Sequence, residues 1–222
     1  MIDNSGAYLL LSNLSAAMKP KFSTLIILTL LCAVLMVPFA LSPIYLDMLR
    51  DRSFDLHQFL RGEWFKQVSG YAATALVVVE MLLTLRKRGR GWSMWPKNLH
   101  IPGSVILWRS VHIFVGTALV GAVLVHTIGA TGINFNALFL WIFFAVTLSA
   151  LIGVVAETGV LESPRKVFSI GRGQVVDGQP TGIGKGALIR GMRGVWLPSH
   201  IYLVSVFTIM LAVHIFLVYY YQ

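Results

Sequence analysis

Four of the six histidines in this 222-residue chain form two pairs with the same spacing. His112 and His126 make one pair and His200 and His214 the other, with thirteen residues between the members of each. In an α-helix, fourteen steps of about 100° end about 40° short of four full turns and rise about 21 Å. Both imidazoles of a pair therefore lie on one side of their helix, near opposite edges of an apolar layer about 30 Å thick.

This spacing favours a haem site at each of two levels. If the two helices run in the same direction, His112 and His200 face each other at one level, and His126 and His214 at the other. Two facing imidazoles form an axial pair for a haem iron, and helical bundles build such sites in their cores. A zinc or copper site would instead gather its ligands at one level. Metal binding without haem and hydrogen-bonded core histidines are the alternatives.

The composition indicates which elements position these residues. The chain is 56% hydrophobic and only 12% charged, whereas soluble domains are about 45–50% apolar and about 25% charged. This excludes a soluble enzyme, a disordered tail and a fibrous repeat. The single cysteine, Cys32, excludes an internal disulfide, an iron–sulfur cluster held only by cysteines of this chain and a C-x-x-C-H site for c-type haem. The sequence therefore predicts an integral membrane protein whose haems are b-type.

Five apolar stretches are long enough to cross a membrane as helices, which takes about 20 residues. They are Phe22–Leu46, Trp64–Leu85, Val105–Ile128, Phe135–Ala156 and Ser199–Tyr221. The first is too long for the apolar region of a signal peptide and lacks a clear cleavage site, so we expect a retained anchor helix. The fold class is thus an all-α membrane bundle of five transmembrane helices, four of them forming a haem-binding core.

The domain organisation follows from these spans. Residues 1–21 form an N-terminal cytoplasmic segment, and residues 22–63 contain the anchor helix and an outer loop. Residues 64–222 form the four-helix dihaem core, with a cytoplasmic loop at 157–198. The two helices that carry the histidine pairs run in the same direction because an even number of crossings separates their starts.

The basic residues orient the bundle. The N-terminal segment, the 86–104 loop, the 157–198 loop and Arg109 hold fourteen of the 18 Lys and Arg residues, and the opposite side holds four. Cytoplasmic loops carry the excess of basic residues. We therefore expect the N-terminus inside and the C-terminus outside, in a bacterial inner membrane. The net charge of +9 reflects this topology and does not indicate nucleic-acid binding.

Other polar residues near the histidines are candidates for cofactor contacts. Arg109 precedes His112, and Arg193 precedes His200. These two histidines lie at the cytoplasmic, or inner, level, where a haem would present its propionates to bidentate guanidinium groups. Snorkelling to lipid headgroups is the alternative for both arginines. Glu80 lies inside the second span and could relay protons to a quinone, or snorkel toward the basic 86–90 run. His57 and His100 fall in loops, and His100 is a further candidate for an inner quinone site.

The pattern of two H-x13-H helices separated by one helix resembles the dihaem core of respiratory and photosynthetic cytochromes b. An arginine three residues before the first ligand, as in Arg109-x-x-His112, is also a feature of that family. The segment Trp196-Leu197-Pro198-Ser199-His200 through His214 looks like the final haem helix of ferric-reductase-type membrane domains. The resemblance covers roughly residues 64–222, and it implies a four-helix fold with two haem b groups and single-electron transfer.

The expected function is therefore that of a dihaem b-type cytochrome subunit carrying electrons across the membrane. It would link the quinone pool to a partner redox subunit with c-type haem, iron–sulfur clusters or molybdenum. The sequence contains no PEWY quinol-oxidation motif and no flavin domain, which favours an electron-transfer subunit over a catalytic chain. A self-contained quinone or ferric reductase with its active site in this chain is the alternative, and a haem-free scaffold protein is a third class.

Overall fold

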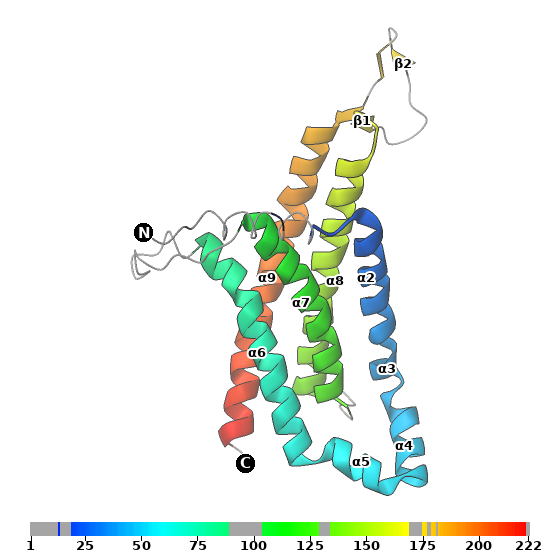
Figure 1. Ribbon diagram of the computed structural model, residues 1–222, viewed down its shortest axis with the longest axis vertical. Helices are drawn as coiled ribbons and strands as arrows, with labels where there is room; N and C mark the ends of the chain where they lie inside the picture. The colour runs from blue at the N-terminus through cyan, green and yellow to red at the C-terminus, as the bar shows by residue number, and fades with distance from the viewer. Residues whose placement is uncertain are drawn as a thin grey trace. The chain divides into compact units, whose positions relative to one another are not determined.

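A computed structural model describes residues 19–88, 104–128, 134–168, 175–176, 179–180 and 182–220, together with Asn13. The described chain is mostly helical and contains two very short antiparallel strand pairs (Figure 1). It divides into two compact units, of which the first comprises residues 1–20 and 34–131 and the second residues 21–33 and 132–222. The all-α class predicted from the sequence is confirmed, and each unit contains one pair of long antiparallel helices.

The first unit is built around α6 (Glu63–Arg88) and α7 (Val105–His126), which pack side by side (Figure 1). Each helix is longer than 20 residues and contains an apolar stretch of 18 residues, which is enough to cross a membrane. Helix α7 begins after Ser104, whose Oγ accepts a hydrogen bond of 3.0 Å from the Leu107 amide. This cap satisfies one of the amides that the first turn of a helix leaves without a partner.

The stretch predicted as a single first span is divided in the structure. It comprises α2 (Phe22–Leu35), α3 (Val37–Ala40) and the start of α4 (Ser42–Arg52), which α5 (Phe54–Arg61) follows. Pro38 accounts for the first break, because it has no amide hydrogen for the Val34 carbonyl and its ring collides with that carbonyl. With 14 residues, α2 is about 21 Å long, which is shorter than the apolar layer.

The second unit is built around α8 (Phe135–Glu162) and α9 (Lys185–Tyr220), which also pack side by side. Asn134 caps α8, because its side-chain oxygen accepts a hydrogen bond of 2.9 Å from the Ala137 amide. Two strand pairs lie between the helices, namely β1 (Val167–Phe168) with β4 (Ile183–Gly184) and β2 (Val175–Val176) with β3 (Gln179–Pro180).

The two helices that flank the predicted 157–198 loop are longer than the sequence predicted. Helix α8 continues to Glu162, and α9 begins at Lys185 and passes through Pro198. Glycine and proline weaken a helix prediction, but helix propensity is a weak preference that packing overrides. Here α9 packs against α8 before Pro198, with the Trp196 ring lying over Gly153. The connection between the two helices is therefore confined to residues 163–184.

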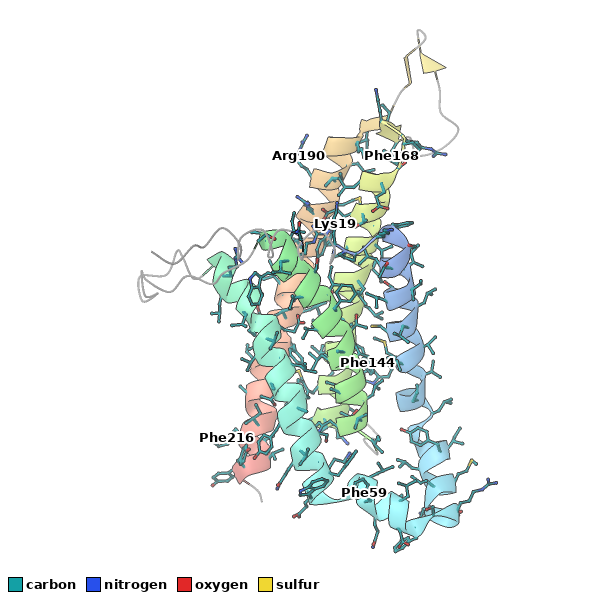
Figure 2. All side chains as sticks on the ribbon, viewed as in Figure 1. Lys19, Phe59, Phe144, Phe168, Arg190 and Phe216 are labelled. Atoms are coloured by element: carbon teal, nitrogen blue, oxygen red, sulfur yellow. The ribbon has the colours of Figure 1, made fainter. Side chains whose placement is uncertain are left out.

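Four described helices, α6, α7, α8 and α9, are long and apolar enough to cross a membrane. Large apolar side chains stand exposed along them: Val78 is 58% exposed, Ile209 66% and Phe216 62%. Figure 2 shows Phe216 near the end of α9. Exposed apolar surface on this scale marks contact with lipid or with another protein. The chain is thus a multi-pass helical membrane protein whose outward side chains contact lipid.

Candidate functional site

His126, in the last turn of α7, is held by the neighbouring helix α6. Its Nδ1 lies 3.1 Å from the Lys66 carbonyl oxygen and 3.2 Å from Ser69 Oγ. The Ser69 hydroxyl donates its own hydrogen to the Phe65 carbonyl at 2.7 Å, so it acts as an acceptor toward His126. Because both neighbours accept, Nδ1 carries the ring proton and Nε2 carries the lone pair.

Two further contacts fix the position of His126. Lys66 Nζ donates to the carbonyl oxygens of His126 and Ile128 at 2.7 and 2.6 Å. These carbonyls belong to the end of α7, where backbone acceptors lack helical partners and a cation is favoured. Gly70 faces the imidazole, and a Cβ added there would lie 3.0 Å from His126 Cε1. The absence of a side chain at Gly70 therefore leaves the room that the ring occupies.

His112, near the other end of α7, has a carboxylate as its neighbour. Glu80 Oε2 on α6 forms an ion-pair contact with His112 Nδ1. Glu80 is only 8% exposed, and its Oε1 is buried without a hydrogen-bond partner among the described residues. Gly116 lies against this carboxylate, since a Cβ there would lie 3.7 Å from Oε1. With Glu80 ionised, its oxygens only accept hydrogen bonds, and the contact with Nδ1 then holds the proton of His112 on that nitrogen.

The second unit repeats this arrangement with neutral acceptors. His200 Nδ1 lies 3.0 Å from Ser149 Oγ, and the Ser149 hydroxyl donates to the Val146 carbonyl at 2.8 Å. His214 Nδ1 lies 3.1 Å from Asn136 Oδ1, which is an acceptor. Both acceptors are on α8 and both histidines are on α9, so Nδ1 carries the proton in these two rings as well.

Three rings thus present Nδ1 to a hydrogen-bond acceptor on the adjacent antiparallel helix, and His112 presents it to the Glu80 carboxylate. Histidines that ligate a metal almost always donate their other ring N–H in this way, which sets the tautomer and orients the ring. Ligation of a haem iron would then use Nε2, the nitrogen that carries the lone pair. The donor chemistry of the four residues therefore fits the axial positions of two haem irons.

The structure brings each histidine together with the helix that precedes its own, within one unit. His112 and His126 belong to the first unit, and His200 and His214 to the second. The predicted pairing of His112 with His200 and of His126 with His214 joins the two units and stays a prediction. The two units have the same arrangement. Helices α7 and α9 each carry two histidines, and the preceding helices α6 and α8 carry the groups that face them.

Arg193, predicted to bind a haem propionate, forms an ion pair with Glu157 in the second unit. Glu157 is almost fully buried at 1% exposure, whereas half of the Arg193 side chain is exposed. The sequence prediction ended the fourth span at Ala156 and left Glu157 in a loop. Its position directly after a long apolar run was the one sign that it belongs to the helix. A buried carboxylate requires such a partner.

Trp196 lies between this ion pair and His200. Its ring occupies the space that a Gly153 side chain would fill, because a Cβ there would lie 2.5 Å from Trp196 Cδ2. The ring centroid is 6.3 Å from that of His200. In the described chain Trp196 Nε1 is buried without a hydrogen-bond partner. Such a donor costs about 1–3 kcal/mol, which an acceptor atom of a bound molecule would offset.

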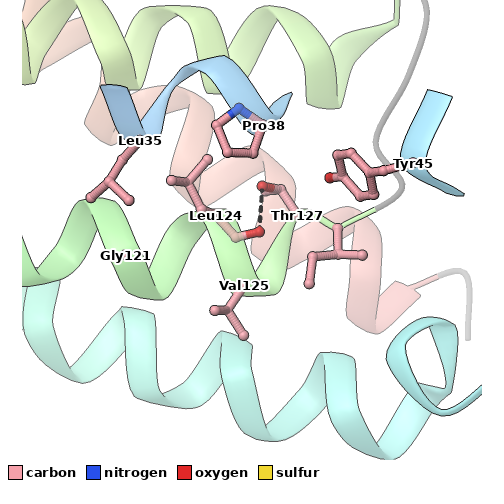
Figure 3. A pocket seen from close by; sticks show the side chains of 8 residues that line it. Leu35, Pro38, Tyr45, Gly121, Leu124, Val125 and Thr127 are labelled. Atoms are coloured by element: carbon pink, nitrogen blue, oxygen red, sulfur yellow. Dashed lines mark hydrogen bonds between the residues drawn. The ribbon is translucent and has the colours of Figure 1, made fainter. Parts of the chain in front are cut away.

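A cavity of about 490 Å³ lies in the first unit beside the last turns of α7 (Figure 3). Its lining residues are Leu35, Pro38, Tyr45, Gly121, Leu124, Val125, Thr127 and Ile128. The Thr127 hydroxyl is engaged by the Val123 carbonyl at 2.7 Å, so Tyr45 supplies the other hydroxyl of the lining. This apolar lining suits a lipid or isoprenoid chain. Gly121 of α7 lies in the wall of this cavity.

The remaining predicted residues are distributed along the chain. Arg109 lies on α7 one turn before His112, as predicted. His57 is on α5, with its ring centroid 6.4 Å from that of Phe54. His100 and most of the predicted 1–21 segment and 86–104 loop lie outside the described residues. The acceptors Ser69, Ser149 and Asn136 were not identified from the sequence.

Comparisons with family models, curated proteins and solved structures found no match for this chain. Among the described residues, no three His, Cys, Asp or Glu side chains form a group that could hold a metal ion. A haem iron in a bundle takes only two protein ligands, one from each of two helices. The geometry of the histidines themselves is therefore the basis for inferring a function.

Proposed function

We propose that this chain is a dihaem b-type cytochrome that carries single electrons across a membrane as a subunit of a larger redox complex. One observation carries the proposal: all four histidines of the two H-x13-H pairs present Nδ1 to an acceptor on the adjacent helix. Four imidazoles of one tautomer, on long apolar helices, are what two pairs of axial ligands require.

Each residue has a role in this proposal. His112 and His200 hold the inner haem and His126 and His214 the outer one, where inner means the cytoplasmic side. Arg109 binds a propionate of the inner haem, and the buried Trp196 Nε1 is a further donor near His200. When bound, haem supplies reversible one-electron chemistry, and the protein determines its position and surroundings.

We propose the orientation that the basic residues favour. The 86–104 and 157–198 loops face the cytoplasm of a bacterial cell, which places the start of α6 and the end of α9 outside. This orientation of α6–α9 does not depend on whether α2–α4 forms a fifth span. An N-terminus inside requires that fifth span, and the division of the segment at Pro38 makes its length the point to test.

We propose that the chain transfers electrons between the quinone pool and a partner redox subunit with c-type haem, iron–sulfur clusters or molybdenum. The competing proposal is a quinone or ferric reductase with its active site in this chain. The contact between Glu80 and His112 supports a role for Glu80 at a haem ligand over its predicted role as a proton relay to a quinone. Reduction of the purified chain by quinol without any other subunit would favour the competing proposal.

Absorption spectra of the purified protein and of four histidine variants test the proposal. We expect two haem b groups per chain in the unmodified protein. His112→Ala and His200→Ala should remove one and the same spectral component, and His126→Ala and His214→Ala the other. Absence of haem b from protein purified out of haem-supplied cells would refute the function. Loss of the same component from His112→Ala and His126→Ala would refute the pairing.

A further inference from the structure

The two histidines of α7 have neighbours of opposite charge. A buried carboxylate, Glu80, contacts Nδ1 of His112. At His126, by contrast, the nearby charge is the Lys66 ammonium, which donates to the backbone carbonyls of His126 and Ile128. In the described chain no carboxylate forms an ion pair with Lys66, and Arg61 is close enough to add its own positive field. Helix α6 therefore places a carboxylate beside the His112 ring and an ammonium at the backbone of His126.

In its described part, the second unit places no net charge beside its own two histidines. Its histidines contact the neutral acceptors Ser149 and Asn136. The buried Glu157 forms an ion pair with Arg193, so the two charges offset each other. Arg109 lies one turn before His112 on α7, and the proposed function pairs it with an anionic propionate. The charged groups in contact with the two α7 histidines are thus Glu80 and Lys66.

We propose that Glu80 and Lys66 set the order of the two haem potentials, with the lower potential at the His112 level and the higher at the His126 level. The inference rests on the proposed function. A negative charge at an axial ligand stabilises the ferric state, and a positive charge stabilises the ferrous state, so the two residues shift the potentials in opposite directions. Unit charges within about 10 Å of each other change an equilibrium more than tenfold at an effective dielectric constant of about 20.

This order of the two potentials gives electron transfer through the protein a direction. With haem bound at both levels, this order would favour transfer of one electron, without a proton, from the His112 level to the His126 level, with one haem oxidised as the other is reduced. In the proposed orientation the electron moves outward, and the partner that accepts it docks on the outer side.

Potentiometric titration of the full chain, followed by its haem spectrum, tests the inference. In Glu80→Gln the lower-potential component should become easier to reduce, with at least a tenfold higher ratio of ferrous to ferric iron at a fixed potential, about 59 mV. Lys66→Gln keeps a hydrogen-bond donor for the α7 carbonyls but removes the charge, so it should make the higher-potential component harder to reduce. Glu80→Asp and Lys66→Arg keep the charges and should retain the original order.

A matched variant in the second unit adds an independent measurement. Asn136→Asp places a carboxylate at Nδ1 of His214 and should make the higher-potential component harder to reduce. If Glu80→Gln loses haem, Lys66→Gln and Asn136→Asp decide the order alone. Two intact haem components whose potentials are unchanged in the neutral variants, or a shift of the higher one in Glu80→Gln, would overturn the inference and leave the proposed function intact. Absence of two haem b components in the unmodified chain would instead refute the proposed function.

Discussion

Substitution of Gly70 by alanine tests whether the position of His126 depends on the space at this glycine. The new Cβ would lie 3.0 Å from His126 Cε1 and 3.4 Å from its Nδ1. Both distances are shorter than or at the lower limit of ordinary contacts, so the ring must move. It cannot move freely, because its Nδ1 is bonded to the Lys66 carbonyl and Ser69 Oγ.

The magnitude follows from three contributions. Overpacking by one methyl group costs about 1–3 kcal/mol, and loss of one Nδ1 hydrogen bond costs about 1 kcal/mol. Alanine is favoured over glycine in a helix by about 0.5–1 kcal/mol, which offsets part of this cost. We therefore expect Gly70→Ala to lower the free energy of unfolding by about 2 kcal/mol and to reduce the content of the haem held by His126.

Gly121→Ala is the matched control, because a Cβ at Gly121 meets no atom within 4 Å. Only the gain in helix propensity applies there, so this variant should be as stable as the original chain or slightly more stable. Unfolding in detergent micelles, followed by helical circular dichroism, measures both variants, and the absorbance of haem b per chain gives the occupancy. Equal stability and equal haem content in Gly70→Ala and Gly121→Ala would refute the reasoning.

Three further predictions concern the second unit and the topology. Gly153→Ala should destabilise α8–α9 by more than 1 kcal/mol, since its Cβ would lie 2.5 Å from the Trp196 ring; thermal unfolding of the variant and of Trp196→Ala in the same background checks this. Arg193→Ala should cost about 3 kcal/mol because it removes the guanidinium that forms an ion pair with the buried Glu157 carboxylate. Glu157→Gln should cost less because Arg193 is half exposed, and equal losses of unfolding free energy would contradict this asymmetry. A cysteine introduced by Gln222→Cys should react only with a reagent supplied from the outer side.

Local properties of the sequence predicted the helices and the candidate ligands. Helix periodicity determines that residues fourteen positions apart share a face, and apolar length determines which segments cross a membrane. Spacing and apolar length together were therefore enough to place His112, His126, His200 and His214 on two long helices. The same local reasoning failed at helix ends, where Pro38 divided one stretch and packing of Trp196 on Gly153 extended α9 through Pro198.

Tertiary structure decided which groups meet the imidazoles. Ser69 and His126 are 57 positions apart, and Asn136 and His214 are 78 positions apart. Their contact depends on the register of two antiparallel helices, which no local periodicity specifies. Glu80 was recognisable as an intramembrane carboxylate, but its contact with His112 comes from the packing of α6 on α7. The sequence alone thus determined the fold class and the histidine positions, and the helix register determined the tautomer, the charge and the partner of each ring.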